Sequence, residues 1–277
     1  MKTRVRPKLP IYQMIPFPKI NPNLIEIGPI HLRWYGLMYV LSFLASYLLI
    51  AKQSRARRIG LRGALLQDLI FFSALGLIIG ARLGYILFYQ FHNFSFYLQH
   101  SLEIIAVWHG GMSFHGGLIG ATLAGILFCR LRHLPFWEVA DTVIITAPIG
   151  LGLGRLGNFI NGELFGRTSS VPWAIVFPDG GPLPRHPSQL YEAGLEGLVL
   201  FIILWRLKDL QLRPGAMVCL FLCGYGVFRF LVEFFRQPDP QIGLLWGLLS
   251  IGQVLCLGMI LTSIVLWVVL GGRPRMR

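Results

Sequence analysis

The stretch LLWGLLSIGQVLCLGMILTSIVLWVVL, residues 244–270, contains no charged residue. A helix needs about 20 consecutive apolar residues to cross the hydrocarbon core of a bilayer, and this stretch is long enough. Six runs of the same kind precede it, at residues 34–53, 65–89, 115–131, 136–157, 189–207 and 215–236. The sequence therefore predicts an all-α integral membrane protein with about seven transmembrane helices.

The composition excludes most other classes of protein. Of the 277 residues, 55 % are hydrophobic and 13 % are charged, and the mean hydropathy is +0.63. Because soluble proteins carry about 25 % charged residues, a soluble enzyme, a disordered chain and a disulfide scaffold are all excluded. The four cysteines lie in apolar runs, so we expect neither disulfides nor a metal site from them. We attribute the net charge of +13 to basic loops that set the orientation of the chain and attract anionic lipid. We therefore expect no nucleic-acid partner.

The loop charges predict the orientation of the chain. The connection at 52–63 carries five Lys and Arg residues, whereas the connection at 90–112 carries none. Because positively charged loops stay in the cytoplasm, we expect an outer N-terminus and a cytoplasmic C-terminus, although the basic N-terminal tail opposes this assignment. We expect residues 1–277 to form a single membrane domain, with residues 158–188, rich in Gly, Pro and Ser, as a small outer-face head segment.

Ionisable and polar residues gather at the outer ends of five predicted spans. Such residues are costly in a membrane and mark function by default. A conduction path would instead place them through the depth of the bilayer. The residues concerned include Tyr35, Arg82, His115, Arg155, Asn158, Glu163, His186, Glu192, Arg229, Glu233 and Arg236.

Helical spacing groups some of these residues on common faces. Arg229 and Glu233 are four residues apart and Arg236 follows after three more, so the three share one face with a net positive charge. Arg155 and Asn158 share a face in the same way. Since arginine binds phosphate through two parallel hydrogen bonds, these residues could cradle the phosphate of a phospholipid. Internal salt bridges and simple anchoring at the lipid interface are the alternative interpretations.

His115 lies in the glycine-rich stretch GGMSFHGG, residues 110–117. An imidazole titrates near neutral pH, so His115 is a candidate general base, although a hydrogen-bonded structural histidine is an equally good interpretation. His109 and His115 lack a third ligand, so we expect no metal. No nucleophile elbow, phosphate-binding loop or zinc-protease motif is present.

Five motifs together resemble the bacterial prolipoprotein diacylglyceryl transferase family. They cover roughly residues 24–255 in the order expected for that family. They are HLRWYGLMY (31–39), GGMSFHGG (110–117), GRLGNFINGELFG (154–166), RHPSQLYE (185–192) and YGVFRFLVEFFRQPD (225–239).

The resemblance implies a seven-span inner-membrane enzyme with an outward-facing active site and no cofactor. Such an enzyme moves the sn-1,2-diacylglyceryl group of phosphatidylglycerol to the lipobox cysteine of a prolipoprotein signal peptide and releases glycerol phosphate. We assign the expected roles by position in the matching motifs. The candidate catalytic residues are His115, Arg229, Tyr35 and Glu233, and the candidate substrate-binding residues are Arg155, Asn158, Glu163, Gly166, Glu192 and His186.

Two interpretations without transferase chemistry remain open at the level of sequence. A lipid transporter or scramblase needs polar residues across the midplane, whereas the inner halves of the last three spans are almost wholly apolar. A purely structural lipid-binding protein would need the arginines but would tolerate the loss of His115.

Overall fold

The computed structural model describes residues 15–27, 30–57, 59–237, 244–245 and 248–271. The chain divides into two compact units. One unit, here called the terminal unit, contains residues 1–46 and 144–277, and the other, the middle unit, contains residues 47–143. The basic residues of positions 1–14 and the Pro238-Asp239 end of the last motif lie outside the described residues.

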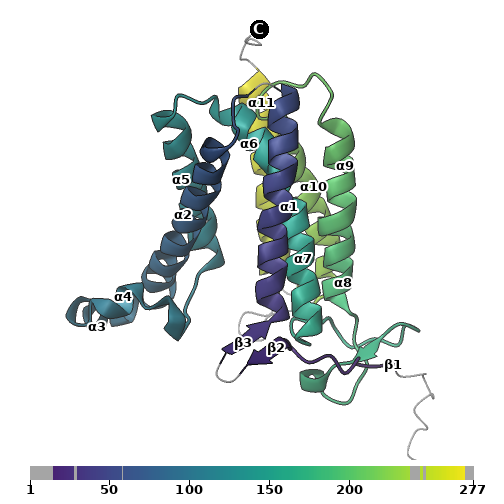
Figure 1. The fold of residues 1–277 in the computed structure, drawn as a ribbon. Helices are drawn as coiled ribbons and strands as arrows, with labels where there is room; N and C mark the ends of the chain where they lie inside the picture. The colour runs from purple at the N-terminus through teal and green to yellow at the C-terminus, as the bar shows by residue number, and fades with distance from the viewer. Residues whose placement is uncertain (1–14, 28–29, 58, 238–243, 246–247, 272–277) are drawn as a thin grey trace, which may run out of the picture. The chain divides into compact units, whose positions relative to one another are not determined.

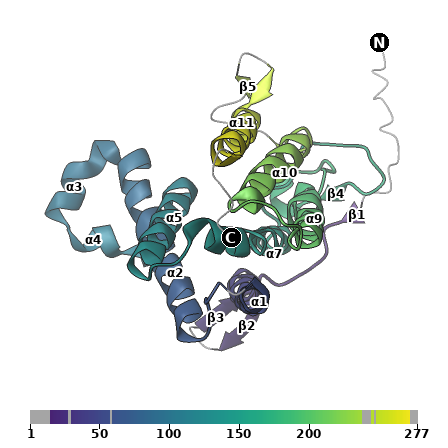
Figure 2. The same cartoon turned by 90° about the horizontal axis from the view of Figure 1, so that it is seen from above.

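Long helices make up the terminal unit. Helix α1 (Trp34–Arg57) begins in this unit, and it is followed there by α7 (Ala147–Ile160), α10 (Ala216–Glu233) and α11 (Ile251–Gly271). Helices α10 and α11 pack side by side, as Figure 2 shows. The buried core between α7, α9 and α10 contains Ile145, Leu200, Leu204, Met217 and Phe221.

A continuous helical segment with an irregular centre runs from Ser188 to Leu207. It consists of α8 (Ser188–Glu192), the π-helical turn η4 (Ala193–Val199) and α9 (Leu200–Leu207). The segment packs against α7 (Figure 1). At this contact Gly152 of α7 lies against Gly197 of η4. Wide turns of this kind are frequently found at functional sites.

The middle unit is built on a close helix pair. Helices α2 (Ala64–Tyr89) and α5 (Phe114–Leu131) lie against each other (Figure 1). A Cβ atom added at Gly80 would lie 2.7 Å from the Cα of Gly120, so only glycine permits this approach. Small residues at four-residue intervals let helix backbones meet in membranes, where the hydrophobic effect does not drive association. A separate buried core at one end contains Ile50, Leu66, Leu69, Phe128 and Val139.

Arg82 of α2 organises the chain at the other end of this pair. Its buried guanidinium donates hydrogen bonds to the carbonyl oxygens of Glu103, Ile104, Gly110 and Gly111. The short helices α3 (Phe94–Gln99) and α4 (Leu102–Ile105) and the 3₁₀ turns η1 (Phe91–Asn93) and η2 (Val107–His109) form this region. Arg82, which the sequence placed among the predicted outer polar residues, thus has a structural role.

Short strands and turns complete the terminal unit. Strand β1 (Ile15–Pro16) pairs in parallel with β4 (Ile175–Val176), and β2 (Asn23–Ile27) pairs with β3 (Ile30–Arg33) in antiparallel fashion. The 3₁₀ turn η3 (Pro178–Gly180) follows β4. The segment predicted as a head at 158–188 contains β4 and η3. Its residues Phe159 and Phe177 pack with Phe17, and Phe165 stacks on Phe177.

The predicted class of fold is confirmed. Six helices among the described residues are long and apolar enough to cross a membrane. The predicted span at 136–157 is α6 (Phe136–Ile144) followed by α7, which has Pro148 in its first turn. The predicted span at 189–207 is the three-part segment, whose centre is π-helical. Helix α11 begins at Ile251 instead of residue 244, because β5 (Leu244–Leu245) and β6 (Leu249–Ser250) pair as strands before it.

The glycine contact gives a testable prediction about the middle unit. We expect Gly120→Ala to lower the free energy of unfolding in detergent by about 1–3 kcal/mol, because its methyl group would force α2 and α5 apart. Gly125→Ala is the matched control, since a Cβ there meets nothing within 4 Å. Equal stability of the two variants would contradict the backbone contact.

Candidate active site

Glu192 lies at the centre of a cluster of charged residues in the terminal unit. Its side chain is fully buried at the end of α8. Its Oε2 atom is 2.6 Å from Nε of Arg155 on α7 and 2.8 Å from Nη1 of Arg229 on α10. Its Oε1 atom is 3.5 Å from Nη1 of Arg236, which follows α10. One carboxylate therefore contacts three guanidinium groups.

Glu233 holds Arg229 from the other side. Its Oε2 atom is 2.8 Å from Nη2 of Arg229, as the four-residue spacing on α10 predicted. Its Oε1 atom accepts a hydrogen bond from Oγ of Ser250 at 3.0 Å, and Ser250 is in turn joined to Gln253 at the start of α11. Arg229 is thereby fixed between Glu192 and Glu233.

Asn158 and Glu163 extend the cluster toward the head segment. Asn158 Oδ1 accepts a hydrogen bond from Nη1 of Arg155 at 3.4 Å, and Asn158 Nδ2 donates to Oε1 of Glu163 at 2.8 Å. Nε2 of Gln189 on α8 donates to the backbone oxygen of Glu163 at 2.6 Å. These bonds tie the turn after α7 to the helix that carries Glu192.

Gly166 and His186 form the backbone next to this turn. The amide of Gly166 donates to the carbonyl oxygen of His186 at 2.8 Å, and a Cβ atom on Gly166 would lie 2.8 Å from Cβ of His186, which requires glycine here. The His186 ring contacts Tyr191 and Phe235, with its Nδ1 atom 3.0 Å from the Tyr191 hydroxyl. Burial lowers the pKa of His186 below its usual value of 6.5, because desolvation disfavours the charged form of the ring.

Among the described residues, Tyr35 and His115 belong to none of the ion pairs given above. The Tyr35 ring packs on Gly157 of α7, and its hydroxyl accepts a hydrogen bond from that of Tyr39 at 3.5 Å. His115 belongs to the middle unit, where it lies exposed in the first turn of α5. That turn is capped by Ser113, whose Oγ accepts a hydrogen bond from the amide of Gly116 at 3.2 Å.

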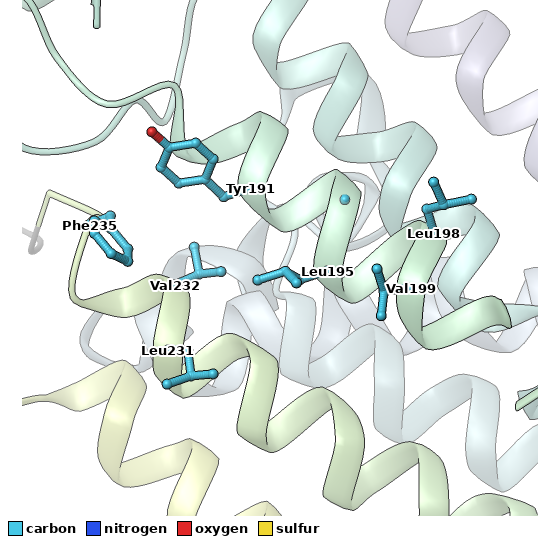
Figure 3. A pocket seen from close by; sticks show the side chains of 8 residues that line it. Tyr191, Leu195, Leu198, Val199, Leu231, Val232 and Phe235 are labelled. Atoms are coloured by element: carbon cyan, nitrogen blue, oxygen red, sulfur yellow. The ribbon is translucent and has the colours of Figure 1, made fainter. Parts of the chain in front are cut away.

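An apolar groove with a volume of about 330 Å³ runs between the segment of η4 and α10. Leu195 and Val199 line it from one helix, and Leu231 and Val232 line it from the other, as Figure 3 shows. Tyr191 belongs to its lining, and Glu192 follows Tyr191 directly in the chain. The groove is therefore formed by the helical segment that carries Glu192 and by α10, which carries Arg229.

The analysis of the sequence missed Glu196. Glu196 is fully buried within η4, and its Oε1 atom is 3.8 Å from Nη1 of Arg229. Its signal was present, because an acidic residue in an apolar run, four residues after Glu192, is costly without a function. The expectation of a net positive set at Arg229, Glu233 and Arg236 is also incomplete, since Glu192 and Glu196 bring two further carboxylates to it.

Comparisons with known proteins agree on one family. Residues 22–269 match the family model described as prolipoprotein diacylglyceryl transferase. A Rhodospirillum rubrum protein is 53 % identical over 260 residues, which cover 92 % of this chain and 94 % of the relative. A Bordetella avium protein is 52 % identical over 265 residues, covering 94 % and 98 %. Both relatives carry the name phosphatidylglycerol–prolipoprotein diacylglyceryl transferase.

The burial of Glu192 leads to a prediction about stability. Glu192→Gln removes the charge shared by three arginines, so we expect a loss of about 3–5 kcal/mol in the free energy of unfolding in detergent. Asp68→Asn is the control, because its pair with Arg132, at 3.2 Å, is largely exposed and should contribute no more than about 1 kcal/mol. Similar losses for both variants would contradict a central role for Glu192.

Proposed function

Because the chain belongs to the prolipoprotein diacylglyceryl transferase family, we infer that it is a multi-pass membrane enzyme that transfers the diacylglyceryl group of phosphatidylglycerol to prolipoproteins. The acceptor in this proposal is the lipobox cysteine of the signal peptide. The sulfur forms a bond to the glycerol carbon, the bond from that carbon to the phosphate oxygen breaks, and glycerol phosphate leaves.

The convergence of Arg155 and Arg229 on one buried carboxylate is the observation that carries this proposal. Negative charge develops on the phosphate as the bond to carbon breaks, and fixed guanidinium groups in a site of low dielectric stabilise such charge strongly. Both side chains are held in place before substrate arrives, Arg155 by Asn158 and Glu192 and Arg229 by Glu192 and Glu233. No rearrangement of solvent is then needed during the reaction.

The remaining residues have proposed roles that follow from their chemistry. Arg155 and Asn158 bind the lipid phosphate, and Glu163, Gly166, Glu192 and His186 shape and hold that binding site. Glu233 orients Arg229, and Tyr35 donates a positioning hydrogen bond. His115 removes the proton of the acceptor thiol, because the thiolate is the reacting form. The apolar groove beside Tyr191 suits an acyl chain of the lipid, since apolar side chains line it from the helical segment that carries Glu192 and from α10, which carries Arg229.

Incubation of the purified protein with phosphatidylglycerol and a lipobox peptide tests the activity. We expect a thioether-linked diacylglyceryl peptide and one glycerol phosphate for each molecule of product. A peptide with serine in place of the acceptor cysteine is the control and should stay unmodified. A folded preparation that forms no product would refute the proposed reaction.

The matched variant for this assay is Arg155→Lys. Lysine keeps the charge but lacks the planar fork that holds two oxygens of a phosphate, so we expect most of the activity to be lost while the protein stays folded. Near-normal turnover in this variant would reduce Arg155 to a general source of positive charge.

The proposed role of His115 predicts a pH-dependent defect. We expect His115→Asn to lower kcat by about 100- to 10,000-fold at neutral pH. Activity should recover in part above about pH 8.5, where the acceptor thiol ionises without help. His109→Asn is the control, because His109 is exposed and pairs with Glu103 at 3.0 Å. An equally low activity at every pH, together with a lower Tm, would show that His115 only supports the fold.

We also propose that the enzyme lies in the bacterial inner membrane with its active site facing outward. The 52–63 loop carries five Lys and Arg residues whereas the 90–112 loop carries none, and this contrast supports the orientation. A cysteine placed at Ser170 should react with a membrane-impermeant thiol reagent applied from outside, whereas one at Leu210 should be protected. The unsubstituted protein gives the background, and the opposite pattern of labelling would reverse the orientation.

A further inference from the structure

Glu196 is a buried charge that the proposed mechanism does not use. Its side chain is fully buried in the π-helical turn η4, and neither carboxylate oxygen has a hydrogen-bond partner among the described residues. Its nearest cation is Nη1 of Arg229 at 3.8 Å, and that nitrogen is already 2.8 Å from Oε2 of Glu192. Glu196 is therefore held less tightly than Glu192 or Glu233.

We define the arginine cluster as the six residues joined by ion pairs, and its charges balance when Glu196 is included in the ionised form. Arg155, Arg229 and Arg236 supply three positive charges, and Glu192, Glu196 and Glu233 supply three negative charges. Without Glu196 the same cluster would carry a net charge of +1. In a buried site this difference acts strongly on any anion, because the low dielectric strengthens Coulomb interactions.

The proposed reaction changes the charge on the bound phosphate. The phosphodiester of the lipid carries one negative charge, whereas a phosphate monoester such as glycerol phosphate carries about 1.5 to 2 at neutral pH. A cluster with an excess of positive charge would therefore bind the product more tightly than the substrate. A neutral cluster holds the product less tightly.

We propose that Glu196 is a positioning residue that acts through Arg229 to keep the arginine cluster neutral, so that glycerol phosphate is released after transfer. The proposal rests on the proposed function, because it assigns a charge change to that reaction. In this proposal Glu196 does not touch the phosphate, whereas Arg229 does. The carboxylate of Glu196 weakens the positive field of the Arg229 guanidinium.

Binding of glycerol phosphate to the purified full-length protein in lipid nanodiscs tests this proposal. At mildly alkaline pH, which favours the ionised form of a carboxyl group, we expect Glu196→Gln to bind glycerol phosphate at least about tenfold more tightly than the unsubstituted protein. Glu196→Asp keeps the charge and should bind within about threefold of the unsubstituted protein. Asp209→Asn, which removes an exposed carboxylate beside Lys208, is the control and should change nothing.

Steady-state kinetics give a second measurement with its own expected sign. In Glu196→Gln we expect kcat to fall, KM for phosphatidylglycerol to stay level or fall, and inhibition by added glycerol phosphate to become stronger. A purely structural role would weaken both catalysis and binding, with a lower Tm. Unchanged or weaker binding of glycerol phosphate in Glu196→Gln overturns the proposal.

The two measurements also separate this proposal from the proposed function. Equilibrium binding of glycerol phosphate needs no turnover, so it is measured even if the transferase assay gives no product. If the protein shows no transferase activity but Glu196→Gln binds glycerol phosphate more tightly, the proposed reaction is refuted. The proposed effect of Glu196 on the charge of the cluster is then still supported. Normal activity with unchanged binding would refute only the role of Glu196.

Discussion

A carboxylate without solvent must be paired, and Glu192 meets this requirement through arginines from separate parts of the chain. Arg155 comes from α7, whereas Arg229 lies on α10 and Arg236 lies just beyond it. Removing one partner from a buried set leaves an uncompensated charge, which is far more costly than the loss of an exposed pair. The ion pairs therefore fix α7, α8 and α10 against one another, and the turn that carries Asn158 and Glu163 follows from that arrangement.

The same interactions that hold these helices also orient the arginines that we propose to bind the lipid phosphate. A guanidinium already oriented by carboxylates loses little conformational entropy when an anion arrives, but the anion must compete with those carboxylates. Arg155 and Arg229 illustrate this balance, because both share Oε2 of Glu192. Substrate affinity in such a site depends on the difference between two sets of strong interactions, so small changes in charge have large effects.

The middle unit is stabilised by different physical means. Its main helix pair depends on glycines that let the backbones of α2 and α5 touch, and Arg82 satisfies four carbonyl oxygens of the turn beyond the pair. Close van der Waals contact and hydrogen bonds replace the hydrophobic effect, which is weak between helices surrounded by lipid. This packing sets the position of His115, because the next residue, Gly116, lies at the contact with Gly80 and Gly84.

The sequence by itself determined the class of fold, the family and the pair of Arg229 and Glu233, because apolar length and helical spacing act within a single segment. It did not determine that α11 begins at Ile251, where paired strands replace the first predicted turns. Nor did it show that Glu192 lies among three arginines or that Glu196 completes their charge. Those contacts join residues 33 to 44 positions apart, and periodicity describes one face of one helix and not its neighbour. Only the packing of α7, η4 and α10 brings those faces together.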